Sequence, residues 1–295
     1  MQYKQILNKK EGARFLIAKK SGLLKKKTEQ AKKILEKCEF CERRCGVNRV
    51  EGETGFCGIG NVPRVFGAHA HFGEEPELIP SATLFFSGCT MRCVYCQNAP
   101  ESVDYDSGII WNSRRIAEWI EQMESFGCKN VNFVGGDPTP NLPWILEALS
   151  LTRAKIPVVW NSNSYYSEKT AALLKGIVDV YLLDFRYFDE RCAVRLSSAP
   201  NYPDVAKRNF LTANKDSELL IRILVMPNHI ECDAKPIIRW IRDKLGPGVR
   251  TNILAQYRPC WHASKYKDIN EPLSISDHQK VVDYAKKIGM SNLVE

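Results

Sequence analysis

Six apolar runs, each four to nine residues long, recur from residue 82 onward and alternate with stretches of helical periodicity. The runs are nearly continuous in apolar residues, which is typical of parallel strands that are buried on both faces. Strand–helix units in series imply right-handed crossovers. Six such units predict an α/β fold built as a partial (β/α)6 TIM-type barrel, because a full barrel needs eight. The expected strands are 82–87, 131–134, 157–163, 178–186, 219–227 and 249–257.

Helices are expected between these strands. Residues 113–126 place Ile116, Trp119 and Ile120 at helical spacing, and the pattern ends at Gly127. A second helix is expected over 233–245, beginning at Asp233, and a last helix near 276–288. Parallel sheets of this kind place functional residues at the C-terminal ends of their strands. The residues that follow each strand are therefore the candidates for a site.

The 295 residues divide into four expected parts. They are a basic helical extension over 1–37, a cysteine-rich metal-binding segment over 38–80, the barrel over 81–265 and a C-terminal helix over 266–295. The sequence shows neither a secretory leader nor an apolar run long enough to cross a bilayer, so a cytoplasmic protein without a membrane partner is expected. Eleven cysteines in such a protein favour metal binding or thiol chemistry over disulfides.

The net charge of +8 is concentrated at the N-terminus. Residues 1–37 hold twelve Lys or Arg against three Glu, so the remainder of the chain is close to neutral. Lysine pairs and triplets interleave with Leu and Ile there, which predicts an amphipathic basic helix. A solvated helix face is one interpretation, and a contact surface for RNA or an acidic protein is the other.

Three thiols stand close together directly after the first strand. The stretch SGCTMRCVYCQN, residues 87–98, spaces Cys89, Cys93 and Cys96 as C-x3-C-x2-C. Thiolates at this density hold iron–sulfur clusters or zinc. Structural zinc takes four protein ligands, whereas three ligands on a four-iron cluster leave one iron free to bind a further group. A redox C-x2-C pair and ordinary buried thiols are the alternatives, and neither accounts for three neighbouring thiols.

Four more cysteines lie upstream, in CEFCERRCGVNRVEGETGFC. Their C-x2-C-x3-C-x11-C spacing among glycines is typical of a loop folded around a metal. Zinc would make this a structural site, and a cluster would make it an electron relay or a second reactive site. Uncoordinated thiols are the third alternative, and the isolated cysteines elsewhere are interpreted as packing residues. The upstream set consists of Cys38, Cys41, Cys45 and Cys57.

The C-x3-C-x2-C loop after the first strand, with Tyr95 before its third cysteine, resembles the radical S-adenosylmethionine (SAM) superfamily. The resemblance implies that Cys89, Cys93 and Cys96 hold a [4Fe–4S] cluster whose open iron binds SAM. It also implies reductive cleavage of SAM to a 5′-deoxyadenosyl radical that takes hydrogen from a substrate, with an electron donor such as a flavodoxin or ferredoxin. With the upstream cysteines, HFGEEP and GGDPTP, residues 38–290 resemble the pyruvate formate-lyase activating enzyme-like branch.

The same resemblance places SAM contacts at the ends of the next strands. GGDPTP (135–140) stands where the family carries a GGE-type motif, with aspartate in place of the commoner glutamate; taken alone it is a turn before a helix. WNSNS (160–164) ends the third strand with short polar side chains, which suit a ligand or cap the next helix. The expected cofactor-binding residues are Tyr95, Gly135, Gly136, Asp137, Asn161, Ser162 and Asn163.

Charged residues end the fourth strand and interrupt the fifth. Asp184 and Arg186 are spaced i, i+2 and so face the same side of a strand; they resemble the D-x-K of the activating enzymes with Arg for Lys. Arg222 fits the R-x-x-V-x-P pattern of the fifth strand. The three are expected to be catalytic. The alternative is a structural ion pair between Asp184 and Arg222, because an arginine within an apolar strand needs a buried partner.

A radical SAM enzyme that takes hydrogen from a residue of a protein or peptide is the leading expectation. Activating enzymes act on proteins, and an open partial barrel can admit a backbone segment. An RNA-modifying radical SAM enzyme is an alternative suggested by the basic extension. A non-catalytic metal-binding interaction module is a third, and it predicts that no SAM is cleaved.

Overall fold

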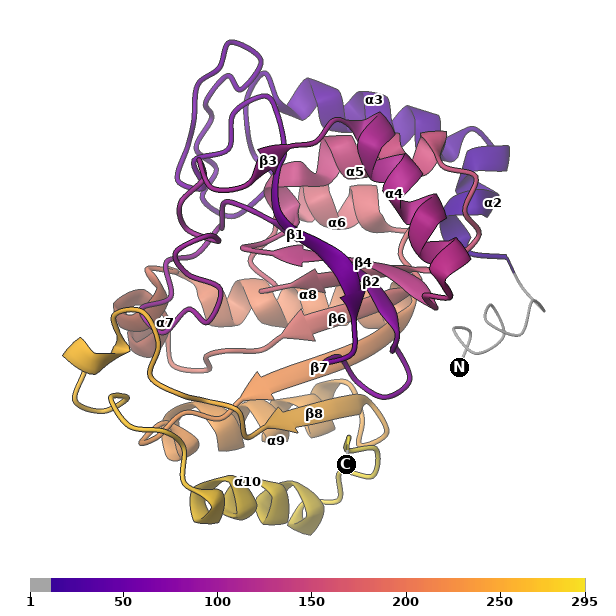
Figure 1. The fold of residues 1–295 in the computed structure, drawn as a ribbon. Coiled ribbons are helices and arrows are strands. Elements are labelled where there is room, and N and C mark those ends of the chain that lie inside the picture. Colours follow the sequence, from indigo (N-terminus) through magenta and orange to yellow (C-terminus); the bar gives the residue numbers. More distant parts are fainter. Residues whose placement is uncertain (1–11, 295) are drawn as a thin grey trace.

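The computed structural model describes residues 12–294. Its centre is a curved eight-stranded sheet with the order β3-β1-β2-β4-β5-β6-β7-β8 (Figure 1). The six predicted strands correspond to β2 and β4 to β8, which pair in parallel, so the predicted α/β partial barrel is confirmed. The strands are β1 (Arg64–His71), β2 (Ser81–Phe86), β3 (Ile109–Ile110), β4 (Asn130–Gly135), β5 (Val158–Ser162), β6 (Val180–Asp184), β7 (Glu218–Leu224) and β8 (Arg250–Leu254).

Helices cover the outer face of the sheet. In Figure 1, α4 to α6 cover the upper part of the curved sheet, and α9 and α10 cover its lower part. The helices are α2 (Arg14–Lys20), α3 (Leu23–Ile34), α4 (Ser113–Phe126), α5 (Leu142–Leu151), α6 (Glu168–Leu174), α7 (Glu190–Ser197), α8 (Tyr202–Asp216), α9 (Lys235–Lys244) and α10 (Ile275–Lys287), with the short turns η1 (Thr139–Asn141), η2 (Ile230–Ala234) and η3 (Ala263–Lys265). No helix within residues 12–294 is long and apolar enough to cross a membrane.

Two antiparallel strands extend the parallel sheet at one edge. β1 comes from the segment expected to be cysteine-rich and pairs antiparallel with β2 along its length. β3 pairs with β1 at two positions. Neither strand was predicted, since β1 is rich in small and polar residues and β3 is two residues long. The sheet therefore begins at β3 and ends at β8 without closing into a ring.

The beginning of α9 differs from the prediction. Asp233 was expected to start this helix, but α9 begins at Lys235 after the π-helical turn η2. The Asp233 carboxylate instead accepts the backbone N–H groups of Phe188 and Asp189. The predicted end of α4 is confirmed, because Gly127 adopts the left-handed conformation that closes a helix.

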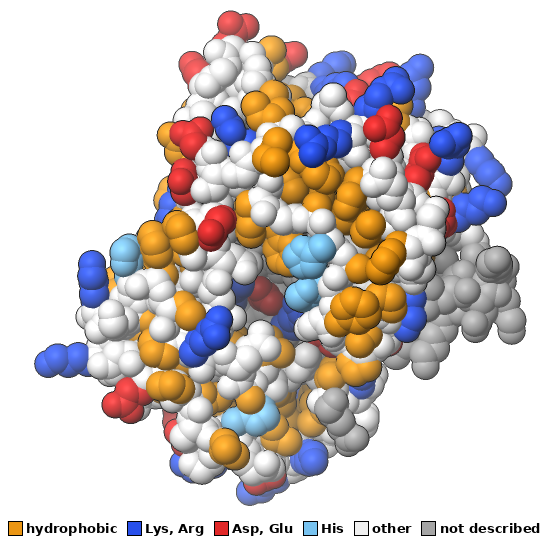
Figure 2. Space-filling view, in the orientation of Figure 1, with side chains coloured by type: hydrophobic (Ala, Val, Ile, Leu, Met, Phe, Trp, Pro, Cys, Tyr) orange, Lys and Arg blue, Asp and Glu red, His pale blue; other side chains and the backbone are white. Residues whose placement is uncertain are grey.

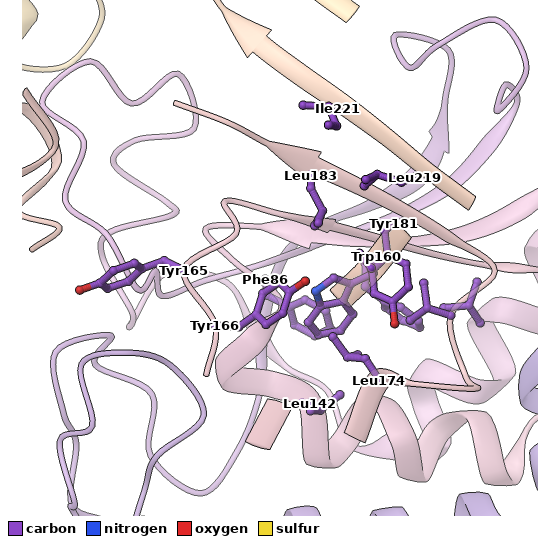
Figure 3. Close-up of a cluster of buried hydrophobic side chains, with 14 of the residues drawn as sticks. Phe86, Leu142, Trp160, Tyr165, Tyr166, Leu174, Tyr181, Leu183, Leu219 and Ile221 are labelled. Atoms are coloured by element: carbon purple, nitrogen blue, oxygen red, sulfur yellow. The ribbon is translucent and has the colours of Figure 1, made fainter. Parts of the chain in front are cut away.

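Aromatic side chains from several strands fill the space between the sheet and the helices. Phe86, Trp160 and Tyr181 come from β2, β5 and β6, and Figure 3 shows them gathered with Leu142 and Leu174 of the covering helices. Trp160 is fully buried. Burial of this kind contributes about 25 cal/mol per Å² of apolar surface and fixes the strand ends on which the site is built.

The described part of the basic extension packs against the barrel. Helix α3 lies against α5, with Leu24 and Ala31 fully buried. Both interpretations of the lysine run place its side chains at the surface. The ammonium of Lys27 is instead buried, and it donates to the carbonyls of residues 172, 173 and 175 at the C-terminus of α6. A lysine at this place satisfies carbonyls that the helix leaves free. The part of the expected helical extension in residues 1–11 lies outside the described residues.

Candidate active site

Residues 87–98, which we call the three-cysteine loop, follow β2 at the C-terminal end of the parallel strands. A cavity of about 830 Å³ begins beside this loop and extends through the interior of the sheet. Twelve of the predicted site residues line it: Cys89, Cys93, Tyr95, Cys96, Gly135, Gly136, Asn161, Ser162, Asn163, Asp184, Arg186 and Arg222. The structure therefore brings together residues from the ends of β2, β4, β5 and β6, as expected for a parallel sheet, with Arg222 from within β7.

The cavity also opens sideways, between the two unjoined edges of the sheet. His71 and Gly73 at the end of β1 form one side of this opening, and His278 and Gln279 of α10 form the other. Figure 2 shows a hollow on this face, with acidic and basic side chains inside it and histidines at its rim. We call this feature the lateral opening.

Each thiol of the three-cysteine loop has a polar neighbour. Cys93 Sγ accepts the hydroxyl of Ser197 at 3.0 Å, and Cys96 Sγ lies 3.2 Å from the hydroxyl of Ser102. Cys89 Sγ accepts the backbone N–H of Met91 at 3.4 Å. Burial raises the pKa of the Cys93 thiol, so binding a metal here must displace the proton. Hydrogen bonds to sulfur stabilise a thiolate once it is formed, and they tune the potential of a bound cluster.

Tyr95 is held inside the loop by a chain of hydroxyl groups. Its hydroxyl lies 2.6 Å from that of Tyr187, which lies 2.6 Å from that of Ser197. Because Ser197 also contacts Cys93, this chain connects the aromatic residue of the motif to one of the three thiols. Tyr187 and Ser197 were not predicted as site residues, because the segment that follows β6 carries no motif.

Asp137 lies behind the cavity wall and braces the end of β5. Its carboxylate accepts the Ser162 hydroxyl at 2.9 Å and the Asn163 backbone N–H at 3.0 Å. It also accepts the backbone N–H of Thr139 at 2.9 Å. The side chain is 1% exposed, so its oxygens are used within the protein. The structure therefore shows Asp137 positioning Ser162 and Asn163, which themselves line the cavity.

The two glycines before Asp137 permit a close approach between backbones. A Cβ at Gly135, whose φ is +120°, would lie 2.1 Å from the backbone nitrogen of Phe86. A Cβ at Gly136 would lie 2.2 Å from the carbonyl oxygen of Gly88. Larger residues at either position would push the three-cysteine loop away from β4.

Asp184 and Arg186 form an ion pair at the cavity wall. Arg186 Nη2 lies 2.5 Å from Asp184 Oδ2, which agrees with the prediction that both side chains face the same side. Arg186 Nε is buried and has no partner among the described residues. An unpaired buried N–H group in a cavity wall favours a ligand that accepts a hydrogen bond.

Arg222 pairs with two glutamates of the β1–β2 turn, so the alternative of an ion pair with Asp184 is wrong. Its Nε and Nη2 donate to Glu75 at 2.8 and 2.7 Å, and Nη2 also contacts Glu74. Asn132 donates to Glu74 and Asn252 donates to Glu75, each at 2.8 Å. These five residues form a polar layer across the barrel interior, which we call the floor.

The floor was missed because the two glutamates lie far from Arg222 in the sequence. They belong to HFGEEP, which was recognised as part of the branch motif without a role for its acids. Burial alone would raise the pKa of Glu75, but the hydrogen bonds from Arg222 hold it below its usual range. The arginine therefore keeps a carboxylate charged inside the barrel.

The upstream cysteine set packs directly on the three-cysteine loop. The guanidinium of Arg43 lies over the ring of Phe56, 3.6 Å from its centroid, and Arg43 Nε donates to the carbonyl of Thr90 at 2.9 Å. Arg92 stacks on the same ring and bonds the Phe56 carbonyl. The segment thus supports the loop, whatever its own thiols hold.

The spacing of the upstream thiols bears on the two metal alternatives. Within residues 12–294, no three of these four sulfurs lie within 4.8 Å of one another. Neighbouring sulfurs in a tetrahedral zinc–thiolate site are about 3.8 Å apart, because each Zn–S bond is about 2.3 Å. Zinc or a cluster at this set therefore stays a prediction.

Comparison with known proteins defines the family. Residues 83–241 match the radical SAM superfamily. The chain belongs to the radical SAM superfamily. An uncharacterized protein of Methanocaldococcus jannaschii is 45% identical to this radical SAM protein over 277 residues, which are 92% of this chain and 80% of the relative. A second protein of that organism, named provisionally as a glycyl-radical enzyme activating enzyme, is 25% identical over 113 residues, which are 38% of this chain and 43% of that protein.

Two solved structures share the fold of this radical SAM protein. Streptococcus suis SuiB bound to the precursor peptide SuiA matches with a TM-score of 0.52 and 14% identity, over 68% of this chain and 43% of SuiB. HydG, a maturase of the [FeFe]-hydrogenase, also matches with a TM-score of 0.52 and 14% identity, over 99% of this chain and 66% of HydG. The chain thus spans less than half the length of SuiB and about two thirds of HydG.

Membership of the superfamily makes this protein an enzyme and implies a [4Fe–4S] cluster and SAM as its cofactors. The residues present fit both groups. Three thiols face one cavity, and no three of their sulfurs lie as close as the ligands of a single zinc ion. The unpaired Nε of Arg186 offers a buried donor in the cavity wall.

Proposed function

We infer that this radical SAM enzyme belongs to the activating enzyme-like branch and takes a hydrogen atom from a residue of a protein or peptide. The observation that carries this inference is the lateral opening. The cavity runs from the three-cysteine loop to the space between β1 and α10, so a chain segment can enter from the side. A closed barrel would admit a substrate at its mouth alone.

The rim of the lateral opening has an unpaired strand edge. β3 pairs with β1 at Arg64 and Val65, and within the described residues the outer edge of β1 has no strand partner from residue 66 to residue 71. An extended peptide can add to such an edge by backbone hydrogen bonding. His69 and His71 pack on Phe85, with ring centroids 5.4 and 6.0 Å from it, and form an aromatic wall beside this edge.

Two of the compared proteins support the same class of substrate. One relative carries the name of an activating enzyme for glycyl-radical enzymes, which are proteins. SuiB, whose fold is similar, was solved with a precursor peptide bound. Both agree with a polypeptide substrate.

The proposed roles of the residues follow their positions. Cys89, Cys93 and Cys96 ligate the [4Fe–4S] cluster, and the walls formed by β4, β5 and β6 hold SAM. With one electron from a donor such as a flavodoxin or ferredoxin, these two groups would supply methionine and a 5′-deoxyadenosyl radical that can take hydrogen from the substrate. Arg186, held by Asp184, donates a hydrogen bond to the bound ligand.

SAM cleavage is the first test. The cluster-loaded protein, incubated anaerobically with SAM and a strong reductant, should form 5′-deoxyadenosine and methionine. Cys93→Ala should abolish both products, while Cys128→Ala, at a buried position outside the cavity, should leave them unchanged. A wild-type protein that holds its cluster and forms neither product would refute the radical SAM activity.

The class of substrate is tested by the origin of the hydrogen atom. The enzyme is incubated with deuterated cell extract that has been separated into protein, nucleic acid and small-molecule fractions. Deuterium should appear in 5′-deoxyadenosine with the protein fraction. If it appears with the nucleic acid or small-molecule fraction, the polypeptide proposal is wrong although SAM cleavage stands.

The RNA-modifying alternative depends on exposed lysines of α3. Lys27 is engaged by the barrel, but Lys25, Lys26 and Lys33 are exposed. Deleting residues 1–37 would also remove buried core residues, so the sharper test is to change the three exposed lysines to glutamine. If the salt dependence of RNA binding is unchanged by these substitutions, the exposed face of α3 does not bind RNA.

A further inference from the structure

Four potential metal ligands that are separated in the sequence meet at the C-terminal end of β7. Cys192 lies on α7, His229 follows β7, and Cys232 and Asp233 belong to η2. One ligand atom from each of the four lies within 4.8 Å of all the others. None of the four lines the cavity, so the group is separate from the active site.

The distances in this group are close to those of a zinc site. Cys232 Sγ lies 3.6 Å from His229 Nδ1 and 3.6 Å from Asp233 Oδ2. In a tetrahedral site, a sulfur at about 2.3 Å and a nitrogen or oxygen at about 2.0–2.1 Å from the zinc are about 3.5 Å from each other. His229 Nδ1 and Asp233 Oδ2 are now 2.9 Å apart, and zinc would separate them to about 3.3 Å.

Surrounding groups orient two of the ligands. His229 Nε2 lies 3.1 Å from the carboxylate of Asp268. A histidine that binds metal through one nitrogen usually gives its other N–H to a carboxylate, which fixes the ring and the tautomer. One oxygen of Asp233 accepts the backbone N–H groups of residues 188 and 189 at 2.7 and 2.9 Å. Its other oxygen is the one that faces His229 and Cys232.

We propose that Cys192, His229, Cys232 and Asp233 bind one zinc ion in a closed, structural site. Two thiolates, one imidazole and one carboxylate suit zinc, which accepts sulfur, nitrogen and oxygen ligands in a tetrahedron. Four protein ligands leave no open position, which is the arrangement of structural rather than catalytic zinc. Binding releases the two thiol protons.

The zinc site ties the three-cysteine loop to the barrel. Cys192 stands near the beginning of α7, and the end of the same helix holds the loop: the carbonyl of Leu196 accepts the backbone N–H of Val94, and the Ser197 hydroxyl donates to Cys93. The other three ligands follow β7. Zinc would therefore fix α7 against the end of β7 and, through α7, the position of the loop.

Zinc content tests the proposal independently of SAM cleavage. The full chain is purified anaerobically with its clusters, treated with EDTA to remove weakly bound metal, and analysed for zinc and iron. Wild type should hold one equivalent of zinc more than Cys192→Ser or Cys232→Ser, with the same iron content. The matched controls are Cys128→Ser and Cys260→Ser, which should keep the wild-type zinc. Because the result is a difference, zinc at any other site does not affect it.

Cobalt substitution provides the second measurement. Cobalt(II) bound to the wild type should show the visible bands of a tetrahedral thiolate site, and His229→Gln should lose them while the iron stays unchanged. Equal zinc in the wild type and in folded cysteine variants would overturn the proposal. A disulfide between Cys192 and Cys232, seen as a mass lower by two hydrogens in zinc-free protein, would overturn it as well. If the variants do not fold, absence of the cobalt bands in wild type decides against zinc.

Discussion

Replacing Arg222 with methionine should leave two buried carboxylates without their cation. The Glu75 side chain is 0% exposed, that of Glu74 is 6% exposed and that of Arg222 is 16% exposed. Methionine keeps much of the length of arginine and fills irregular space, so the main effect is electrostatic. After the change, the amides of Asn132 and Asn252 still donate to the two carboxylates, but no positive charge offsets the cost of burying them.

The size of the effect follows from the burial of the floor. Removing one partner of a buried ion pair costs about 3–5 kcal/mol. In a chain of this size 1 kcal/mol shifts Tm by roughly 2 °C, so a loss of about 6–10 °C is expected at pH 8. Without the hydrogen bonds and charge of Arg222, burial raises the pKa of Glu75 above that of an unfolded chain. Stability of the variant should therefore increase as the pH falls, and the loss should be smaller at pH 5.5.

Calorimetry of the cluster-loaded protein under anaerobic conditions measures this loss. Changing Glu74 and Glu75 to glutamine in the Arg222→Met background removes the buried charge and should restore at least half of the lost Tm. Arg153→Met is the matched control, because this arginine is 88% exposed in its pair with Glu121, and its Tm should stay close to that of wild type. If Arg222→Met melts within 2 °C of wild type but abolishes SAM cleavage, Arg222 acts on the ligand and the structural reasoning is wrong.

Three further predictions concern other buried groups. Burial raises the pKa of Asp179 to about 6, against about 3.9 in an unfolded chain. The folded state therefore binds this proton more tightly than the unfolded chain, and the free energy of unfolding falls as the pH rises from about 4 to about 6. Between pH 5 and pH 7 the wild type should therefore lose about 1 kcal/mol relative to Asp179→Asn, a relative Tm shift of about 2 °C. Lys27→Met removes the cap of α6 and should lower the free energy of unfolding, measured by urea titration, by about 2 kcal/mol. The control Lys26→Met, at an exposed position, should change it by less than about 0.5 kcal/mol. Ser197→Ala removes a hydroxyl 3.0 Å from Cys93 Sγ and should make the cluster potential more negative by up to about 60 mV in an EPR redox titration; an unchanged potential would show that the hydroxyl does not act on the cluster.

The sequence predicts the parallel strands because each carries its own pattern. A strand covered on both faces is mostly apolar, so β2 and β4 to β8 could be recognised one at a time. β1 escaped recognition because one of its faces lies at the lateral opening, where His69 and His71 replace apolar residues. The prediction that α9 begins at Asp233 was wrong because of a contact that is distant in sequence. The Asp233 carboxylate could cap its own helix, but it accepts the backbone N–H of Phe188 instead.

The candidate site was predictable where its residues are close in sequence. The three thiols of the loop fall within eight residues, so their spacing alone indicates a shared ligand. Arg222 pairs with Glu74 and Glu75 because the β1–β2 turn enters the barrel. The residue types alone do not predict the path of that turn. The same holds for Cys192 and Cys232, which were interpreted as packing residues and meet only after α7 and η2 have been placed by the sheet.

The floor also determines the order in which this protein can be completed during synthesis. Its hydrogen bonds join Glu75 to Arg222, 147 residues later, and to Asn252, 177 residues later. Contacts of such long range form late, because a large loop must close before they stabilise anything. The turn that carries Glu75 emerges from the ribosome early and must wait until β7 and β8 have followed. Until then the carboxylates of Glu74 and Glu75 stay in water, and the cavity lacks its floor.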